Sequence, residues 1–154
     1  PNKLYHHYVL FRYAEILLNY AEAMNEWKGP DATAEGCPLS AREALNQVRD
    51  CADMKHVTEN GTDFTAKVRN ERRIELAFEG HRFYDIRRWK IAGLDEVRNL
   101  YGVKITKSGT SLSYEKVLLQ QMYWNDKMYL FPYPQNEIYM NPDLGQNPGW
   151  STGN

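Results

Sequence analysis

The chain has 154 residues, a formal net charge of −1 and aromatic side chains at 13% of its positions. This aromatic content excludes a disordered chain, because such side chains drive collapse, and no apolar run approaches the 18 residues of a membrane-spanning helix. The small net charge provides no long-range attraction to nucleic acid or to an anionic membrane. Two cysteines, Cys37 and Cys51, are too few for a disulfide framework and lie at opposite ends of a predicted helix, so we expect free thiols.

The first predicted element is a helix from about Val9 to Trp27, which Gly29-Pro30 ends. Its polar residues recur every three or four positions and form one stripe, while the rest of its circumference is apolar. A helix with so wide an apolar surface packs against other elements on two sides. After a loop, Ser40 and Glu43 predict a capping box at the start of a second helix, Ala41 to Met54.

The two predicted helices are typical of a tetratricopeptide-type hairpin, in which small and large apolar residues interlock. One such repeat does not bury its own faces, so we expect partner helices elsewhere in the protein. The residues that fit the pattern are Ala14, Leu17, Leu18, Ala21, Ala41, Leu45 and Val48.

A third helical segment is predicted from Phe64 to about Ile91, in two pieces that meet near Gly80, with Thr62 or Asp63 as N-cap. After this segment, short runs of β-branched and aromatic residues replace the helical pattern. The sequence therefore predicts a helical part over residues 9–91.

Residues 92–154 are predicted to be loop-rich with short strands. Val103–Ile105 and Tyr114–Leu119 flank a turn-forming segment and predict a possible small β-hairpin. Met128–Phe131 is predicted to be extended, residues 135–142 allow one helical turn, and residues 143–154 form a loop-like tail. The fold class is thus mainly α, with tetratricopeptide-like helix pairs and a loop-rich part.

The segment 67–90 is dense in charge, with eight basic and four acidic residues, and aromatic residues lie between them. Such a pattern is a possible nucleic-acid footprint. Ion pairs at helical spacing explain it better, because Arg72–Glu75, Glu79–Arg82 and Asp85–Arg88 are three residues apart. We therefore expect structural ion pairs and no nucleic-acid partner.

Glu71, Glu75 and Glu79 share one helical face, as metal-binding carboxylates do in some helical bundles. Those bundles also need Glu-x-x-His, and Phe78 and Arg82 stand where the histidines would be. No nucleophile or phosphate-binding motif is present either. We expect no metal, no cofactor and no catalytic activity.

Aromatic residues in the last third are the remaining candidates for a binding site. Tyr123, Trp124 and Asn125 combine flat rings with an amide, which suits a sugar whose C–H face stacks while its hydroxyls form hydrogen bonds. These three are the candidate ligand-binding residues. The alternative is that the aromatic residues pack, with Tyr129 and Phe131 alternating into the core and Trp150 holding the tail.

Four stretches carry a resemblance to the C-terminal part of the SusD/RagB family. They are RYAEILLNYAEA at 12–23, ALNQVRDCADM at 44–54, VRNERRIELAFEGHRFYDIRRWK at 68–90 and YLFPYPQNEIYMNPDLGQNPGW at 129–150. The last two are long and specific. The usual Arg-Ala-Gly-Met after the second helix is replaced by Cys51-Ala52-Asp53-Met54.

The resemblance implies a non-catalytic protein that captures oligosaccharide or polysaccharide at the surface of Bacteroidetes. It implies a surface-exposed outer-membrane lipoprotein, anchored by an N-terminal lipid outside this segment, and a TonB-dependent, SusC-like transporter as its partner. The chain would then be the C-terminal segment of a longer protein. The preserved motifs resemble scaffold, so Trp89 is expected in the core. The alternative function is a helical-repeat module that binds a protein and no glycan.

Overall fold

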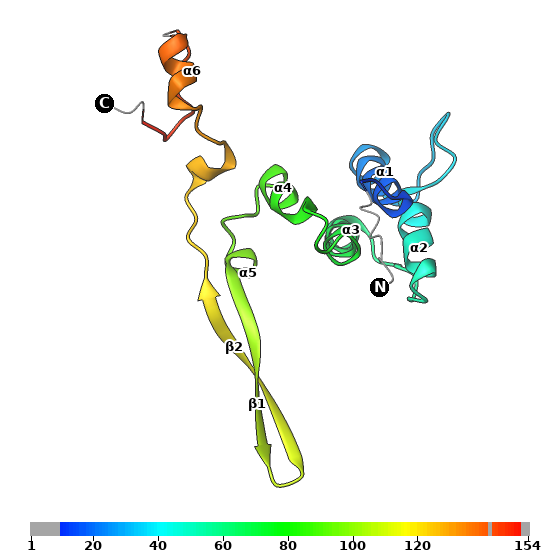
Figure 1. Ribbon diagram of the computed structural model, residues 1–154. Coiled ribbons are helices and arrows are strands. Elements are labelled where there is room, and N and C mark those ends of the chain that lie inside the picture. Colours follow the sequence, from blue (N-terminus) through cyan, green and yellow to red (C-terminus); the bar gives the residue numbers. More distant parts are fainter. Residues whose placement is uncertain (1–9, 142, 152–154) are drawn as a thin grey trace, which may run out of the picture. The chain divides into compact units, whose positions relative to one another are not determined.

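A computed structural model describes residues 10–141 and 143–151. The chain folds as two compact units, residues 1–82 and residues 83–154. The described part is mainly helical, with one two-stranded antiparallel sheet (Figure 1). This confirms the predicted fold class.

Over its described residues, the first unit contains α1 (Tyr13–Lys28), α2 (Ala41–Cys51), α3 (Gly61–Glu75) and the first two residues of a fourth helix. The predicted start of the first helix at Val9 lies outside the described residues. The second helix ends three residues earlier than predicted, and Asp53 beyond it adopts a left-handed φ of 52°.

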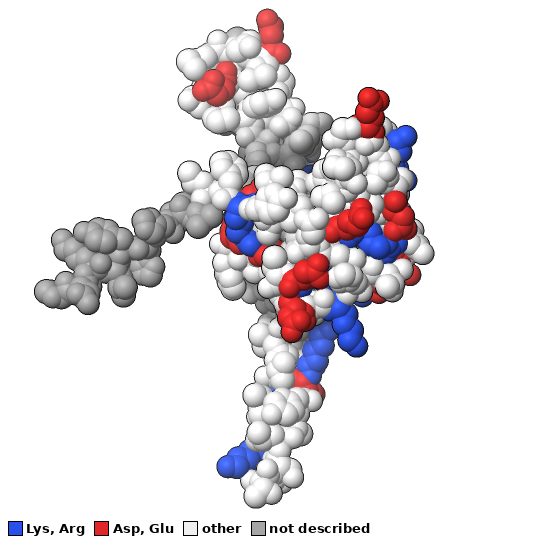
Figure 2. Space-filling view, turned by 90° about the vertical axis from the view of Figure 1, so that its right-hand side faces the viewer, with Lys and Arg blue, Asp and Glu red and all other residues white. Residues whose placement is uncertain are grey.

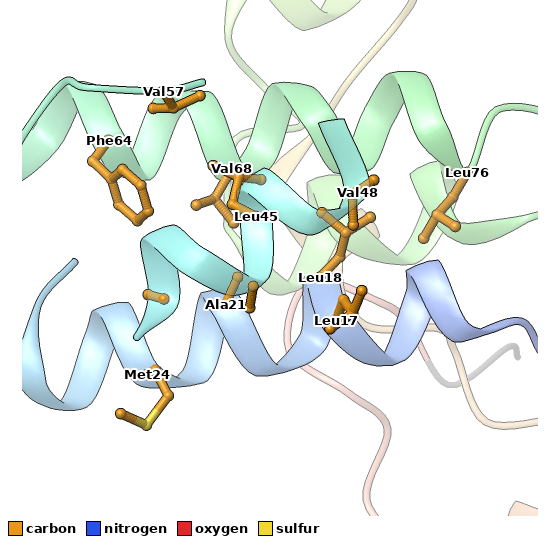
Figure 3. Packing of buried hydrophobic residues seen from close by; sticks show 12 residues of the cluster. Leu17, Leu18, Ala21, Met24, Leu45, Val48, Val57, Phe64, Val68 and Leu76 are labelled. Atoms are coloured by element: carbon orange, nitrogen blue, oxygen red, sulfur yellow. The ribbon is translucent and has the colours of Figure 1, made fainter. Parts of the chain in front are cut away.

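The core of the first unit lies where α1 packs against both α2 and α3 (Figure 3). The wide apolar surface of this helix predicted that it packs on two sides, and the structure confirms this. Leu18 and Leu45 are fully buried, and Phe64 of α3 is buried with them. The buried cluster consists of Leu17, Leu18, Ala21, Met24, Ala41, Ala44, Leu45, Val48, Val57, Phe64, Val68 and Leu76.

The start of α2 is fixed by the predicted capping box. The Ser40 backbone N–H donates to Glu43 Oε2 at 2.7 Å, and the Glu43 N–H donates to Ser40 Oγ at 3.2 Å. These bonds satisfy two backbone N–H groups that would otherwise be unpaired at the start of the helix. Because the carboxylate accepts the backbone hydrogen bond of Ser40, the pKa of Glu43 lies below its ordinary value. The start of α3 differs from the prediction, since Asn60 is its N-cap rather than Thr62 or Asp63.

Arg12, just before α1, ties this helix to the end of α3. Its Nη1 donates to Glu75 Oε1 at 2.6 Å and its Nε to Glu79 Oε1 at 2.9 Å. The hydrogen bonds to Glu79 and Glu75 raise the pKa of the guanidinium above its ordinary value. Because α3 ends at Glu75, the predicted single helical face does not extend to Glu79. Glu71, one turn before Glu75, is buried and pairs with Arg49 of α2. The row of carboxylates is therefore used in ion pairs between helices.

Within the segment 67–90, the predicted Asp85–Arg88 pair is present, and Arg72 makes a contact with another helix. Arg88 Nε donates to Asp85 Oδ1 at 2.9 Å, as the spacing predicted. Arg72 instead reaches across to α1, where its Nη1 donates to Asn19 Oδ1 at 2.6 Å. Figure 2 shows acidic and basic side chains interspersed on the face in view. These contacts favour ion pairing over a phosphate-binding surface.

The second unit is built around short elements. α4 (His81–Arg88) begins directly after Gly80, whose φ is +81°, so the predicted break of the long helix is present. α5 (Asp95–Arg98) leads into the hairpin, and α6 (Gln135–Met140) is the predicted helical turn. Trp89 was expected in the core but is only half-buried, and the Arg88 guanidinium lies 4.7 Å from its ring centroid.

The hairpin of β1 (Asn99–Ser108) and β2 (Ser111–Gln121) is longer than the predicted runs. Turn residues 109–110 join the strands, and a register shift lies between Leu100 and Tyr101. The expected extended run at Met128–Phe131 is wrong at its start, because residues 126–129 form a 3-10 helix, η1 (Asp126–Tyr129). Asn125 caps this helix with its side chain, which overrides the extended preference of the sequence.

Burial divides the two units sharply. All twelve residues of the buried cluster belong to the first unit, whereas the described residues of the second unit include only two buried hydrophobic side chains, Ala92 and Ile138. Within the described ranges, no helix is both long enough and apolar enough to cross a membrane.

We expect Arg49→Ala to lower the free energy of unfolding by about 3–5 kcal/mol, because it leaves the buried Glu71 carboxylate without its partner. Urea denaturation measures the change. Lys67→Ala is the control, since it removes an exposed pair with Glu59 and should cost at most about 1 kcal/mol. Combining Arg49→Leu with Glu71→Leu should restore much of the stability. A loss below about 1 kcal/mol for Arg49→Ala would show that the pair is unimportant.

Acid should destabilise the first unit through Glu43 and Asp31. Hydrogen bonds from Ser40 and Arg42, respectively, lower the pKa values of these carboxyl groups in the folded state. The unfolded chain therefore binds more protons, and stability rises with pH. The contribution is complete above the ordinary pKa values of 4.5 and 3.8 and is lost as pH falls through the lowered folded values. Thermal melts from pH 6 to about 2.5 measure it. Glu43→Gln should flatten this dependence, and identical curves for the two proteins would contradict the assignment.

Candidate functional site

The three predicted ligand-binding residues follow β2 in the second unit, but their surroundings differ. Tyr123 is 74% exposed, so its ring is open to solvent. Asn125 is also exposed, and its Oδ1 accepts a hydrogen bond from the Lys127 backbone N–H at 3.2 Å. That bond caps η1, which gives Asn125 a structural role whether or not it binds a ligand.

Trp124, by contrast, is half-buried and held on several sides. Its ring meets the Tyr129 ring edge-on, with centroids 4.8 Å apart, and its Nε1 donates to Asp126 Oδ1 at 3.3 Å. Its indole also lies directly against the backbone of Gly93, where a Cβ would approach Trp124 Cδ1 to 3.0 Å. These contacts hold the Trp124 side chain in one position.

A guanidinium lies among aromatic rings next to this tryptophan. The Arg87 Cζ is 3.5 Å from the ring centroid of Phe83, 5.3 Å from that of Trp124 and 5.9 Å from that of Phe131. Phe83 and Phe131 stack, with centroids 6.0 Å apart and planes 19° apart. We call these four residues the Arg87 cluster. Among the described residues, the buried Nε of Arg87 has no hydrogen-bond partner, so attraction to the ring faces offsets its lost hydration.

A groove of about 840 Å³ runs beside the Arg87 cluster, within the second unit. Tyr84 and Arg87 of α4 line one part of it, residues 125–127 and 129–131 line another, and Pro148 and Gly149 complete it. The lining is mostly apolar. Of the three sequence-predicted residues, Asn125 lines the groove, Trp124 supports it through Arg87, and Tyr123 is not among the lining residues.

The charged residues of the groove are mostly cations. The lining contains four cationic residues, Arg87, Arg88, Lys90 and Lys127, and one acidic residue, Asp126. Three of these cations have contacts: Arg87 lies among the rings of its cluster, Arg88 pairs with Asp85, and the Lys127 ammonium lies over the Trp150 ring at 4.3 Å.

Exposed rings give the groove its binding chemistry. Tyr84 is 66% exposed and Phe131 is 61% exposed, so each presents a flat apolar face beside hydrogen-bond donors. Sites for small polar molecules combine an apolar bed with a few placed polar groups in this way. The arrangement suits a sugar ring, which stacks on an aromatic face and forms hydrogen bonds at its edge.

Sequence reasoning placed Tyr84 and Arg87 in a structural helix and did not connect them to a site. Their spacing of three residues was a usable signal, because it puts both on the same side of α4. Lys127 carried no comparable signal, since it reaches the groove through the 3-10 helix that the sequence did not predict.

The far side of the groove is fixed by the tail. Trp150 Nε1 donates to the carbonyl oxygens of Lys127 and Leu130, at 3.0 Å each, so the predicted role of Trp150 in holding the tail is confirmed. Gly149 has a φ of +81°, and a Cβ there would come within 2.8 Å of Lys127 Cβ. Glycine is therefore required where the tail passes the 3-10 helix.

Two amide side chains of the tail hold the segment after η1. Gln146 accepts from the Tyr133 N–H at 2.8 Å and donates to the Tyr133 carbonyl at 3.1 Å. Asn147 Nδ2 donates to the Phe131 carbonyl at 2.6 Å. The Gln-Asn-Pro-Gly-Trp part of the sequence thus positions Phe131. The predicted core packing is met only in part by Tyr129, which is half-buried, and is wrong for Phe131, which is exposed.

No cluster of three or more His, Cys, Asp or Glu residues suited to a metal ion occurs in the ranges 10–141 and 143–151. Cys37 is half-buried and Cys51 is exposed, and both are free thiols, as expected.

The first unit packs three helices around an apolar core, and the second unit carries a groove with exposed aromatic rings. The chain belongs to the SusD family, because the model of that family matches residues 2–150.

Individual relatives agree with this assignment. SusD-like protein P25 of Formosa agariphila is 28% identical to this chain and matches 94% of the chain's residues. SusD-like protein P2 of the same organism is 30% identical and matches 93% of the chain's residues. The crystal structure of a SusD-like protein from Bacteroides fragilis matches 92% of the chain with a TM-score of 0.72 and 38% identity. The chain spans about a quarter of the length of these relatives, 24–26%.

Gly93→Ala should displace Trp124 and destabilise the second unit by about 1–3 kcal/mol, because the added methyl group overpacks the contact with the indole. Tryptophan fluorescence and urea denaturation report the change. Gly145→Ala is the matched control, since its Cβ would meet nothing within 4 Å. Equal stabilities of the two variants would show that Trp124 is not held against residue 93.

Proposed function

We propose that this chain is the C-terminal segment of a longer, non-catalytic glycan-capture protein. The protein would sit at the bacterial surface as an outer-membrane lipoprotein and deliver oligosaccharide to a TonB-dependent, SusC-like transporter. Its lipid anchor would lie outside these residues. The observation that carries the proposal is the family match, which extends over residues 2–150.

The length of the relatives supports the first part of the proposal. Proteins of the same family match this chain over more than nine tenths of its length, yet the chain corresponds to only about a quarter of theirs. In a full-length protein of this size, we expect most glycan contacts and the lipid anchor to lie outside this segment.

The groove supports a contribution of this segment to glycan binding. It offers the exposed rings of Tyr84 and Phe131, the amide of Asn125 and nearby cations around an apolar bed. We propose the groove, with Tyr123 and Trp124 of the adjoining segment, as a glycan contact. Such a surface binds sugar by stacking and hydrogen bonding and lacks the paired carboxylates of a glycoside hydrolase.

The test is a titration of the full-length protein with a panel of polysaccharides, followed by tryptophan fluorescence and calorimetry. Tyr84→Ala and Tyr123→Ala should each raise the Kd about 2- to 12-fold, because one lost stacking contact costs about 0.5–1.5 kcal/mol. Tyr139→Ala is the matched control, since Tyr139 is 70% exposed on α6 and does not line the groove. Chromatography should recover the glycan unchanged.

Each outcome discriminates between the functions considered. Glycan binding that neither variant affects would keep the capture function and move the contact away from this groove. The absence of a response to any polysaccharide would contradict capture and favour the alternative, a helical-repeat module that binds only a protein.

A further inference from the structure

The groove of the second unit has an excess of positive charge. Four cations, Arg87, Arg88, Lys90 and Lys127, line it together with one carboxylate, that of Asp126. All of the lining residues lie within 83–154, so the charge of the lining is set inside one unit. The whole chain has a net charge of −1, and the cations are therefore a local concentration rather than a result of its composition.

The two arginines of the groove differ in how far their charge is compensated. Arg88 Nε donates to the buried Asp85 carboxylate at 2.9 Å, which neutralises it. Arg87 Nη1 donates to an uncharged group, the Phe83 carbonyl, at 2.8 Å, and its guanidinium otherwise lies against ring faces. A ring face attracts a cation without adding a negative charge, so Arg87 keeps its positive charge.

The two lysines of the groove are also uncompensated. The Lys127 ammonium is 4.3 Å from the Trp150 ring centroid, again an uncharged partner. Over residues 10–141 and 143–151, the exposed Lys90 side chain has neither an ion pair nor a hydrogen bond. The one carboxylate of the lining, that of Asp126, accepts from Trp124 Nε1 at 3.3 Å. The groove therefore retains positive charge that an anionic ligand can neutralise.

The backbone of Lys90 is a second, independent observation. Its φ of +54° lies in the left-handed region, which glycine adopts more easily than lysine. Glycine occupies such a position at Gly80 and Gly149, where φ is +81° in each case. Lys90 forms no ion pair within the described residues that would offset this strain. Strained residues of this kind are concentrated at functional sites, which indicates a role for the side chain outside the fold.

The aromatic rings restrict the kind of anion. Tyr84 and Phe131 are exposed and line the same groove as the lysines. An inorganic anion or an acidic peptide would use the cations and leave these flat apolar faces without a partner. A sugar ring that carries an acidic group uses both, because its C–H face stacks while its oxyanion forms charge-assisted hydrogen bonds.

We propose that the groove selects an acidic glycan, in which a sugar ring stacks on Tyr84 or Phe131 and a carboxylate or sulfate group pairs with Lys90 or Lys127. The inference rests on the proposed function, glycan capture, and specifies the chemical class of the glycan. Carboxylate and sulfate are both oxyanions that suit these cations, and the experiment separates them.

Pairs of polysaccharides that differ only in charge test the proposal on the full-length protein. Polygalacturonate and alginate are each compared with their methyl esters, and dextran sulfate and carrageenan with their desulfated forms. At least one charged polymer should bind several-fold more tightly than its neutral counterpart, as measured by calorimetry. Its Kd should rise with ionic strength, because salt screens exposed charges. The pair that responds identifies the carboxylate or the sulfate.

Two variants with opposite expected effects separate recognition from folding. Lys90→Gln should raise the Kd for the charged polymer about 2- to 5-fold, the effect of losing one exposed ion pair. Asp126→Asn should lower that Kd, because it removes the negative charge and keeps an oxygen that accepts from Trp124 Nε1. A misfolded protein does not gain affinity. Lys107→Gln is the matched control, since it removes the same charge from the second unit and does not line the groove.

The outcomes distinguish this inference from the proposed function. Binding of neutral polysaccharides alone, with a Kd that salt and Lys90→Gln leave unchanged, keeps glycan capture and overturns the acidic-glycan inference. A charged polymer that binds Lys90→Gln and Asp126→Asn like the unaltered protein overturns it as well. Polyglutamate that binds as tightly as the acidic polysaccharides would assign the groove to an acidic peptide and overturn the inference. No response to any polysaccharide contradicts glycan capture itself.

Discussion

The burial of α1 on two sides is the constraint on which the rest of the first unit depends. Leu18 and Ala21 are fully buried, and the helix can hide them only if α2 and α3 pack on it together. The polar contacts follow this geometry: Arg12 and Asn19 lie where they meet Glu75 and Arg72 of α3. The ion pairs thereby fix how the helices are aligned, while apolar burial provides most of the stability.

The second unit is held in another way, because it has little apolar core. Its described contacts are a guanidinium among rings, side-chain hydrogen bonds to backbone and the ladder of one hairpin. Such contacts orient groups well but contribute little free energy each, since each replaces an interaction with water. This explains why the groove lies in this unit: its aromatic side chains are available for contact.

Much of the fold follows from the sequence, because its signals are local. The Ser40–Glu43 capping box, the break at Gly80 and the Asp85–Arg88 pair each depend on residues within a few positions. The partner of Glu79 was not predictable in this way, since Arg12 lies 67 residues away. At the candidate site, the aromatic content around Trp124 was evident from the sequence, but its contacts with Gly93 and Arg87 come from tertiary packing. The 3-10 helix was missed because one side-chain cap outweighed an extended pattern.

The hydrogen bonds made by the tail have a consequence for solubility. Residues 130–134 include Pro132 and Pro134, which lack the backbone N–H that an added strand would need, so only the remaining backbone groups of this segment could pair with another chain. Gln146, Asn147 and Trp150 occupy the donors and acceptors that a neighbouring molecule would need to add itself as a strand. The Gln-Asn-Pro-Gly-Trp sequence therefore leaves this segment few free backbone groups with which another chain could pair.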